Sequence, residues 1–407
     1  MAGHPPDAGA DAVNTPDAAG AARRSLVALF AATFAELAGL FMFGPLLLLT
    51  LKARGLDTAA IGAFAALQWA GLLAATPFAS AWVQRLGPRR ALLVSGAVPL
   101  ATVTGMVVTY QLDGGLWLWA LLYFIGGLAS ALRWILAEAT VAELAPAAQR
   151  GRVMGLFAMM IGLTFMAGPA LLSALLAAGL GFAAAGWVAV ALVALGLLLL
   201  WPVRLPPALP QPAEAGLVGW RGTWAALRAA PIVMLTGFVG GFFESGLAGL
   251  LPLYGLMLGF SAALSALLVS ASGLGSTLLA VVAGEGADRL PLQRLRQACA
   301  GGCIAATLAL PLVPSWRPLA GLIAFVWGGA GAALYTLAMV QIGARHRGVA
   351  LVNSTAVLVL AYTAGGMLAP AAGGLMLQWA PGLGFPALLL GVASLGLWRG
   401  DGPMDRQ

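Results

Sequence analysis

The chain has 407 residues, of which 61% are hydrophobic and only 9% are charged. A soluble domain carries roughly 25% charged residues, so this composition excludes an ordinary soluble protein and indicates a membrane protein. The formal net charge of +7 comes from basic residues scattered along the chain, which does not indicate a nucleic-acid-binding surface.

A helix needs about 20 mostly apolar residues to cross a bilayer. The apolar runs of this chain end at proline, glycine and arginine clusters. They predict an all-α integral membrane protein with twelve spans, near residues 25–51, 58–82, 91–110, 116–141, 153–178, 182–202, 230–257, 260–283, 295–313, 317–340, 349–379 and 381–398. Residues 1–24, rich in Ala, Asp, Gly and Pro, are expected to form a disordered cytoplasmic tail, and residues 399–407 a second tail.

The apolar pattern stops between the sixth and seventh spans, where five prolines punctuate residues 202–212. We therefore expect residues 203–229 to be a cytoplasmic linker between two six-helix bundles, residues 25–202 and 230–398. Short motifs also recur about 200 residues apart. Arg150-Gly151 is repeated as Arg347-Gly348, at equivalent places in the two halves. The repetition predicts two pseudo-symmetric bundles.

The loops after the second and eighth spans carry related sequences with glycine and basic residues. With the twelve spans and the linker, they resemble the major facilitator superfamily of secondary transporters, from about residue 25 to 398, with bacterial efflux and antiporter branches nearest. The resemblance implies that this loop signature gates the transporter. The first copy has Ser80 and Gln84 at its glycine and aspartate positions, which implies a weaker latch there. The signature residues are Arg85, Gly87, Arg89 and Arg90 in the first copy and Gly284, Asp288 and Arg289 in the second.

A second resemblance is to the glycine and proline signature of the fifth helix, which is associated with antiporters. In this chain Leu172 and Ser173 replace two of its glycines, and a fuller form stands in the eleventh span. Small residues let helices approach closely, which suits a rocking contact but also suits ordinary tight packing. The residues are Gly162, Gly168 and Pro169 in the fifth span and Pro370, Gly373 and Gly374 in the eleventh.

Four charged residues lie well inside predicted spans: Glu36, Arg133, Glu138 and Glu244. A charged side chain at bilayer depth is energetically costly, so it marks a candidate site for binding a ligand or relaying a proton. The resemblance implies that the first, fourth, seventh and tenth spans, which include these residues, line a central cavity. We expect Glu36 and Glu244 to carry protons or bind a cationic group. The alternative is that each is a structural glutamate hydrogen-bonded to a neighbouring helix.

Arg133 is expected either to hold a substrate anion or to pair with Glu36 or Glu244 and tune its proton affinity. Glu138 lies nearer the cytoplasm, where it could pair with Arg85 or Arg89 as a gating latch. Polar and aromatic residues in the same region are expected to line the cavity, namely Trp134, Trp327, Tyr335 and Gln68.

The sequence thus predicts a secondary active transporter that exports a small, partly hydrophobic molecule by proton antiport and alternating access. Proton-coupled uptake by symport is the alternative, and a scaffold or receptor that transports nothing is less favoured. No phosphate-binding loop, catalytic cluster or metal-ligand set stands out, so we predict no enzyme activity, metal or cofactor, with the proton gradient as energy source. The expected partners are the substrate, protons and the lipid bilayer, without nucleic acid, around a monomer.

The basic residues also predict the orientation of the chain in the membrane. Only Lys52, Arg54 and Arg317 fall in loops on the side opposite the linker. Because basic residues collect in cytoplasmic loops, both termini are expected in the cytoplasm, with the protein in the bacterial inner (plasma) membrane.

Overall fold

The computed structural model describes residues 16–112, 115–146, 149–204, 228, 230–345 and 348–398, and this part of the chain is helical without a strand. Its first half contains α1 (Pro16–Ala53), α2 (Thr58–Ala75), α3 (Ala79–Leu86), α4 (Pro88–Gln111), α5 (Leu116–Leu144), α6 (Arg150–Ala177) and α7 (Phe182–Leu200). The second half contains α9 (Pro231–Gly241), a π-helix (Phe242–Gly246), α10 (Leu251–Met257), α11 (Ala262–Ala287), α12 (Leu292–Leu308), α13 (Leu319–Arg345), α14 (Gly348–Trp379) and α15 (Gly384–Leu395).

Among the described residues, ten helices are long and apolar enough to cross a membrane. A broken pair forms an eleventh span, in which residues 231–246 and α10 meet at a bend of 58°. The twelfth predicted span contains only α15, whose 12 residues reach about 18 Å and fall short of a bilayer's hydrocarbon core. The all-helical architecture predicted for the chain is confirmed.

Local sequence explains where the helices break. Pro77 lies in a short 3₁₀ turn, Thr76–Phe78, that divides the predicted span 58–82 into α2 and α3. Gly55, Gly179 and Gly259 adopt positive φ angles of 84°, 80° and 76° in the loops after α1, α6 and α10. Glycine pays no steric penalty in this conformation, so it suits these tight connections.

Two predicted boundaries need correction. α1 begins at Pro16, so residues 16–24 are helical, although we expected them in a disordered tail. Alanine is the strongest helix former, and residues 18–22 contain four of them. The seventh span, predicted as one run over 230–257, is broken after the π-helix, between Gly246 and Leu251. Residues 1–15, nearly all of the linker and the tail at 399–407 lie outside the described residues.

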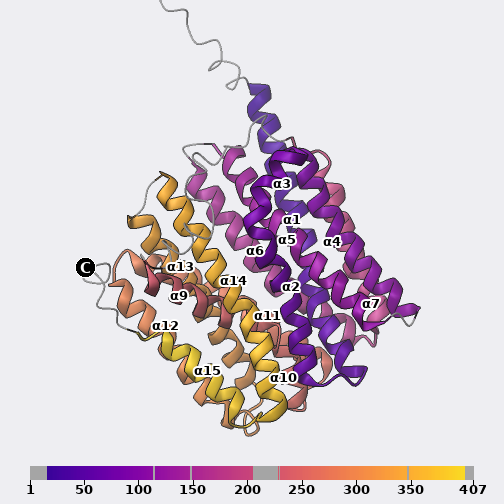
Figure 1. Ribbon diagram of the computed structural model, residues 1–407, viewed down its shortest axis with the longest axis vertical. Helices are drawn as coiled ribbons and strands as arrows, with labels where there is room; N and C mark the ends of the chain where they lie inside the picture. The colour runs from indigo at the N-terminus through magenta and orange to yellow at the C-terminus, as the bar shows by residue number, and fades with distance from the viewer. Residues whose placement is uncertain are drawn as a thin grey trace, which may run out of the picture.

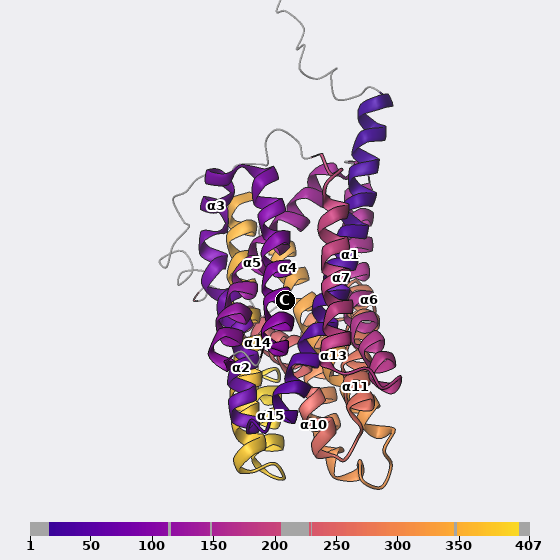
Figure 2. The ribbon, with the colours of Figure 1, turned by 90° about the vertical axis from the view of Figure 1, so that its right-hand side faces the viewer.

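The two halves pack side by side, with the first in indigo to magenta and the second in orange to yellow (Figure 1). They meet where α2 packs against α14 and where α6 packs against α11. Thr58 N–H at the start of α2 donates to Gln378 Oε1 near the end of α14, at 2.9 Å. This contact lies at the end of the bundle away from the start of α1, where α10 ends and α15 begins (Figure 2).

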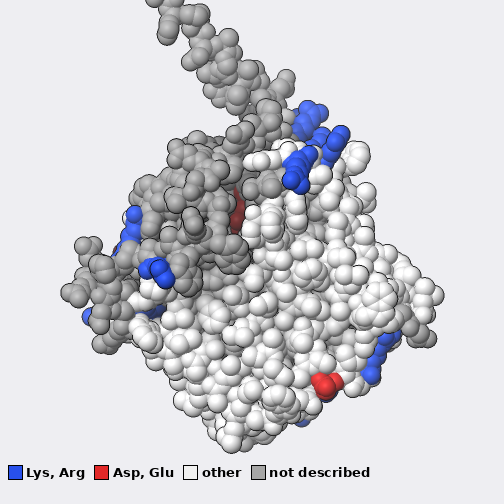
Figure 3. All heavy atoms as spheres, viewed as in Figure 1, with Lys and Arg blue, Asp and Glu red and all other residues white. Residues whose placement is uncertain are grey.

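Towards the other end, which carries the N-terminus and α3, the molecule is hollowed. Figure 3 shows an acidic side chain set back in this hollow, whereas the lower surface in the same view is mostly uncharged, with one acidic group and a few basic groups near its lower right. A surface of that kind suits contact with lipid, so the exposed leucines, valines and tryptophans need no protein partner.

Candidate functional site

Glu36 forms a buried ion pair inside the first half. Arg133 Nε on α5 donates to Glu36 Oε2 on α1 at 2.7 Å, and the side chains are 5% and 2% exposed. Arg133 Nη2 also donates to Thr33 Oγ1 at 3.1 Å. On the far side, α7 presses against α1, because a Cβ added at Gly196 would lie 2.9 Å from Glu36 N. Of the two partners considered for Arg133, the structure places it on Glu36.

Glu244 has different surroundings in the second half. Ser276 Oγ on α11 donates to Glu244 Oε1 at 2.6 Å, and Tyr362 Oη on α14 donates to Glu244 Oε2 at 3.0 Å. Because the single hydroxyl proton of Tyr362 is used in this bond, Ser245 donates in turn to Tyr362 Oη. Glu244 is partly exposed and forms no salt bridge within the described residues. Its partners are neutral hydroxyl groups.

The backbone around Glu244 is irregular, and two neighbouring helices pack closely against it. The π-helix Phe242–Gly246 contains Glu244, and such single-turn bulges occur often at functional sites. A Cβ at Gly331 of α13 would lie 2.6 Å from Glu244 N, and one at Gly241 would collide with the Tyr362 carbonyl. Glycines therefore let α13 and α14 approach the widened turn closely.

The side of α5 away from α4 carries Trp134 and Glu138, one helical turn apart and both exposed. Across from them on α13 lies Tyr335, whose ring meets that of Tyr362 edge-on at 4.8 Å between centroids. The Glu138 carboxyl lies near enough to the Tyr335 hydroxyl for its charge to act on that group. Tyr335 also lies near Glu244, so α5 of the first half and α13 of the second half both place polar side chains close to this region.

Two expectations about individual residues are corrected by the geometry. Trp327 does not line a cavity, because its side chain is 1% exposed and its indole donates to Thr307 Oγ1 of α12 at 3.2 Å. Glu138 makes no salt bridge with Arg85 or Arg89 among the described residues, so the predicted latch is not formed in this conformation. The Arg89 guanidinium instead lies 3.5 Å from the Trp201 carbonyl oxygen.

The remaining predicted residues lie in loops or in helix contacts. Gly87 has a positive φ of 77° between α3 and α4, and Asp288 directly follows α11. Arg90 and Arg289 are exposed, Gln68 is partly buried, and Gly284 lies near Thr336 of α13. Gly168 approaches α1, since a Cβ there would lie 2.6 Å from the Ala38 oxygen, and Gly162 faces Thr277 of α11. Pro370 and Gly374 face Gly62 of α2, whereas Gly373 faces Leu250.

Sequence reasoning missed Ser276 and Tyr362, the hydrogen-bond partners of Glu244. The chain contains five tyrosines, and Tyr362 lies in the middle of the apolar eleventh span, so its position was a usable signal. No comparable signal pointed to Ser276, because serines are frequent throughout the eighth span. Among the described residues, no three His, Cys, Asp or Glu side chains lie together in a way that could hold a metal ion.

Relatives in bacteria carry the same type of chain. The sequence is 24% identical over 337 residues to the uncharacterized MFS-type transporter YcaD of Salmonella paratyphi A, covering 82% of this chain and 84% of that protein. It is 23% identical to the uncharacterized MFS-type transporter YfkF of Bacillus subtilis over 61% of this chain, a match that spans only 62% of YfkF.

Solved structures share the fold at low sequence identity. A mutant of the nucleoside transporter NupG superposes with a TM-score of 0.72 at 15% identity, over 93% of this chain and 97% of that one. A D-xylose-proton symporter superposes with a TM-score of 0.69 at 14% sequence identity, over 92% of this chain and 94% of the symporter. The human organic anion transporter MFSD10 superposes with a TM-score of 0.67 at 18% sequence identity, over 92% of this chain and 98% of MFSD10.

The family itself follows from the sequence. Residues 29–355 match the model of the Major Facilitator Superfamily, which is most of the chain. Its members are transporters of small molecules and not enzymes, and the multi-pass helical architecture fits that role. The chain therefore belongs to the Major Facilitator Superfamily of membrane transporters.

Proposed function

We propose that this transporter couples the export of a small, partly hydrophobic molecule to proton entry, and that Glu244 carries the proton. One observation supports this assignment most strongly. Glu244 is partly exposed and bound only by hydroxyl groups, whereas Glu36 is 2% exposed and held by Arg133 at 2.7 Å. Of Glu36 and Glu244, only Glu244 can change its charge without breaking an ion pair in the described residues.

The hydroxyl partners can serve both charge states of Glu244. The ionised carboxylate accepts hydrogen bonds from Ser276 and Tyr362 at 2.6 and 3.0 Å. When the carboxyl is protonated, its O–H can donate to a hydroxyl oxygen, because hydroxyl groups both donate and accept. With no cation paired to Glu244 in the described residues, proton uptake leaves the site neutral. A neutral site costs less to enclose at bilayer depth, so protonation favours the conformation that seals the carboxyl from water.

The side chains around the hollow support the proposed substrate class. Trp134 and Tyr335 offer aromatic surface, and Glu138 offers a polar contact on the same face of α5 as Trp134. Such a lining suits a molecule that is partly apolar and partly polar. The direction of transport rests on the resemblance of Gly168 and Pro169 to an antiporter signature. Gly168 packs tightly against α1 within the first half, as a small residue allows.

The cellular setting completes the proposal. Basic residues favour the linker side of the predicted spans, so this end faces the cytoplasm and both termini lie there. The hollow would then open to the cytoplasm in the conformation described. We expect a monomer in the bacterial inner membrane, with the proton gradient in place of any cofactor.

Proteoliposomes test the coupling directly. A pH-sensitive dye trapped inside reports proton movement while nucleosides, sugars and lipophilic amines are added in turn under an imposed pH gradient. For a transported compound, Glu244→Gln should abolish gradient-driven accumulation, and the double variant Glu36→Leu/Arg133→Met, which removes both charges of the buried pair together, is the control. Proton movement opposite to the compound supports export, and movement in the same direction indicates uptake. Unchanged gradient-driven transport in Glu244→Gln would refute the assignment of the proton site.

A further inference from the structure

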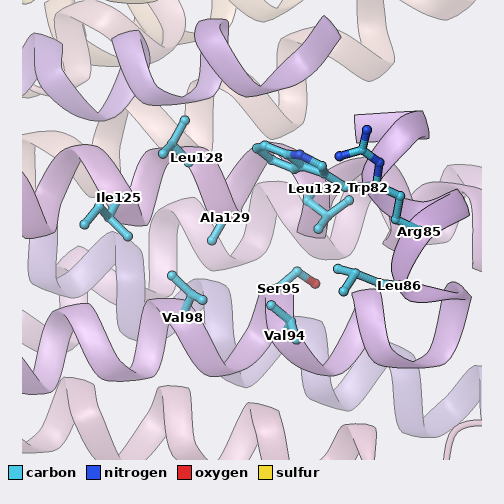
Figure 4. Close-up of a pocket in the computed structure, with 10 residues that line it drawn as sticks. All are labelled: Trp82, Arg85, Leu86, Val94, Ser95, Val98, Ile125, Leu128, Ala129 and Leu132. Atoms are coloured by element: carbon cyan, nitrogen blue, oxygen red, sulfur yellow. The ribbon is translucent and has the colours of Figure 1, made fainter. Parts of the chain in front are cut away.

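A groove of about 370 Å³ runs along the outer side of the first half, between α3, α4 and α5. Its walls are almost entirely apolar, with Arg85 and Trp82 at one end and Ile125 at the other (Figure 4). The apolar side chains between these ends come from all three helices and include Leu86, Val94, Val98, Leu128 and Leu132.

The groove faces away from the hollow between the two halves. Ile125 and Leu132 are seven residues apart, so they lie two turns apart on the same face of α5. Trp134 is two residues beyond Leu132, which turns it by about 200° to the opposite face. Leu86 and Val94 are 40% and 43% exposed, so the groove is open along its side. In a membrane-spanning bundle, such an opening faces lipid chains.

The end of the groove near α3 is positively charged. Arg85 is exposed and forms no salt bridge within the described residues. α4 begins three residues later, and its first turn contains Arg89 and Arg90 but no acidic side chain. The N-terminus of α4 adds partial positive charge and has no side-chain cap. Trp82 lies beside Arg85, and tryptophan favours the boundary between headgroups and acyl chains.

We propose that this groove binds one anionic phospholipid, with an acyl chain along the apolar walls and the phosphate on Arg85. The charge decides between lipids, because a groove that is lined by Arg85 and by no acidic side chain favours a lipid with net negative charge over a zwitterionic one. Basic pockets between spanning helices on the cytoplasmic side are a recognised setting for anionic headgroups. The site does not depend on Glu244 or on transport direction.

Native mass spectrometry of the full-length, delipidated protein tests the site with two added probes, phosphatidylglycerol and phosphatidylcholine. We expect phosphatidylglycerol to bind more tightly, and Arg85→Gln to weaken its binding about fivefold, the effect of roughly one basic residue near an anionic surface. Val98→Phe, which places a larger side chain in the wall of the groove, should weaken binding of both lipids. Arg24→Gln, an exposed arginine on α1, is the charge-matched control.

The outcomes separate clearly. Equal affinity for the two lipids would overturn the headgroup assignment, as would an Arg85→Gln protein that binds like Arg24→Gln. If Val98→Phe melts at the wild-type temperature and binds both lipids normally, the acyl chain does not occupy the groove. If that variant is unstable, Arg85→Gln alone still decides the proposal.

Discussion

Replacing Arg133 with methionine should destabilise the protein strongly, because it leaves Glu36 buried without its partner. The two side chains are 5% and 2% exposed, and their charged atoms are 2.7 Å apart. Removing one member of such a buried pair costs about 3–5 kcal/mol, since an uncompensated charge remains. The same substitution also removes the hydrogen bond from the guanidinium to Thr33.

The double variant Glu36→Leu/Arg133→Met provides the informative comparison. It removes both charges together and should recover most of the loss, because apolar replacements of a buried pair are often close to neutral. Unfolding free energies can be measured by circular dichroism during titration of the detergent-solubilised protein with sodium dodecyl sulfate. A loss of less than about 1 kcal/mol for Arg133→Met, as for an exposed pair, would refute the reasoning. A double variant as unstable as the single one would also contradict it.

Three further predictions concern helix contacts and hydrogen bonds. Gly62→Ala should weaken the contact of α2 with α14, because its Cβ would collide with the Pro370 oxygen. Chemical labelling of a cysteine introduced into the loop after α10 should then increase, because that end of the bundle opens. Thr307→Val should cost about 1 kcal/mol in unfolding free energy but leave transport unchanged, because Trp327 loses only a packing hydrogen bond. Tyr362→Phe should shift the pH dependence of transport while the protein remains folded, and an unaltered pH profile would count against the hydroxyl network.

The parts of the fold that depend on local composition could be predicted from the sequence. Long apolar runs predict the helical spans, and the prolines at 202–212 are the basis for predicting two halves. The departures arise where a few residues override the general pattern. Pro77 breaks the second span, and close contacts with Gly331 and Tyr362 accompany a π-turn in the seventh. Neither follows from hydrophobicity alone.

The candidate site was predictable only in part. Glu36, Arg133 and Glu244 stood out because charges are rare in spans. Which of them pair depends on helix rotation, and a pattern of apolar residues all around each helix leaves that rotation open. The direction of Trp327, whose indole points towards α12, could not be predicted for the same reason.

Infrared difference spectroscopy of the reconstituted protein tests the central claim most directly, by following the protonated carboxyl group as pH is lowered. The proposal predicts a carbonyl stretching component that grows with acidification, disappears in Glu244→Gln and persists in Glu36→Gln. A spectrum unaffected by Glu244→Gln, or a component lost only in Glu36→Gln, would contradict the assignment of Glu244 as the proton carrier.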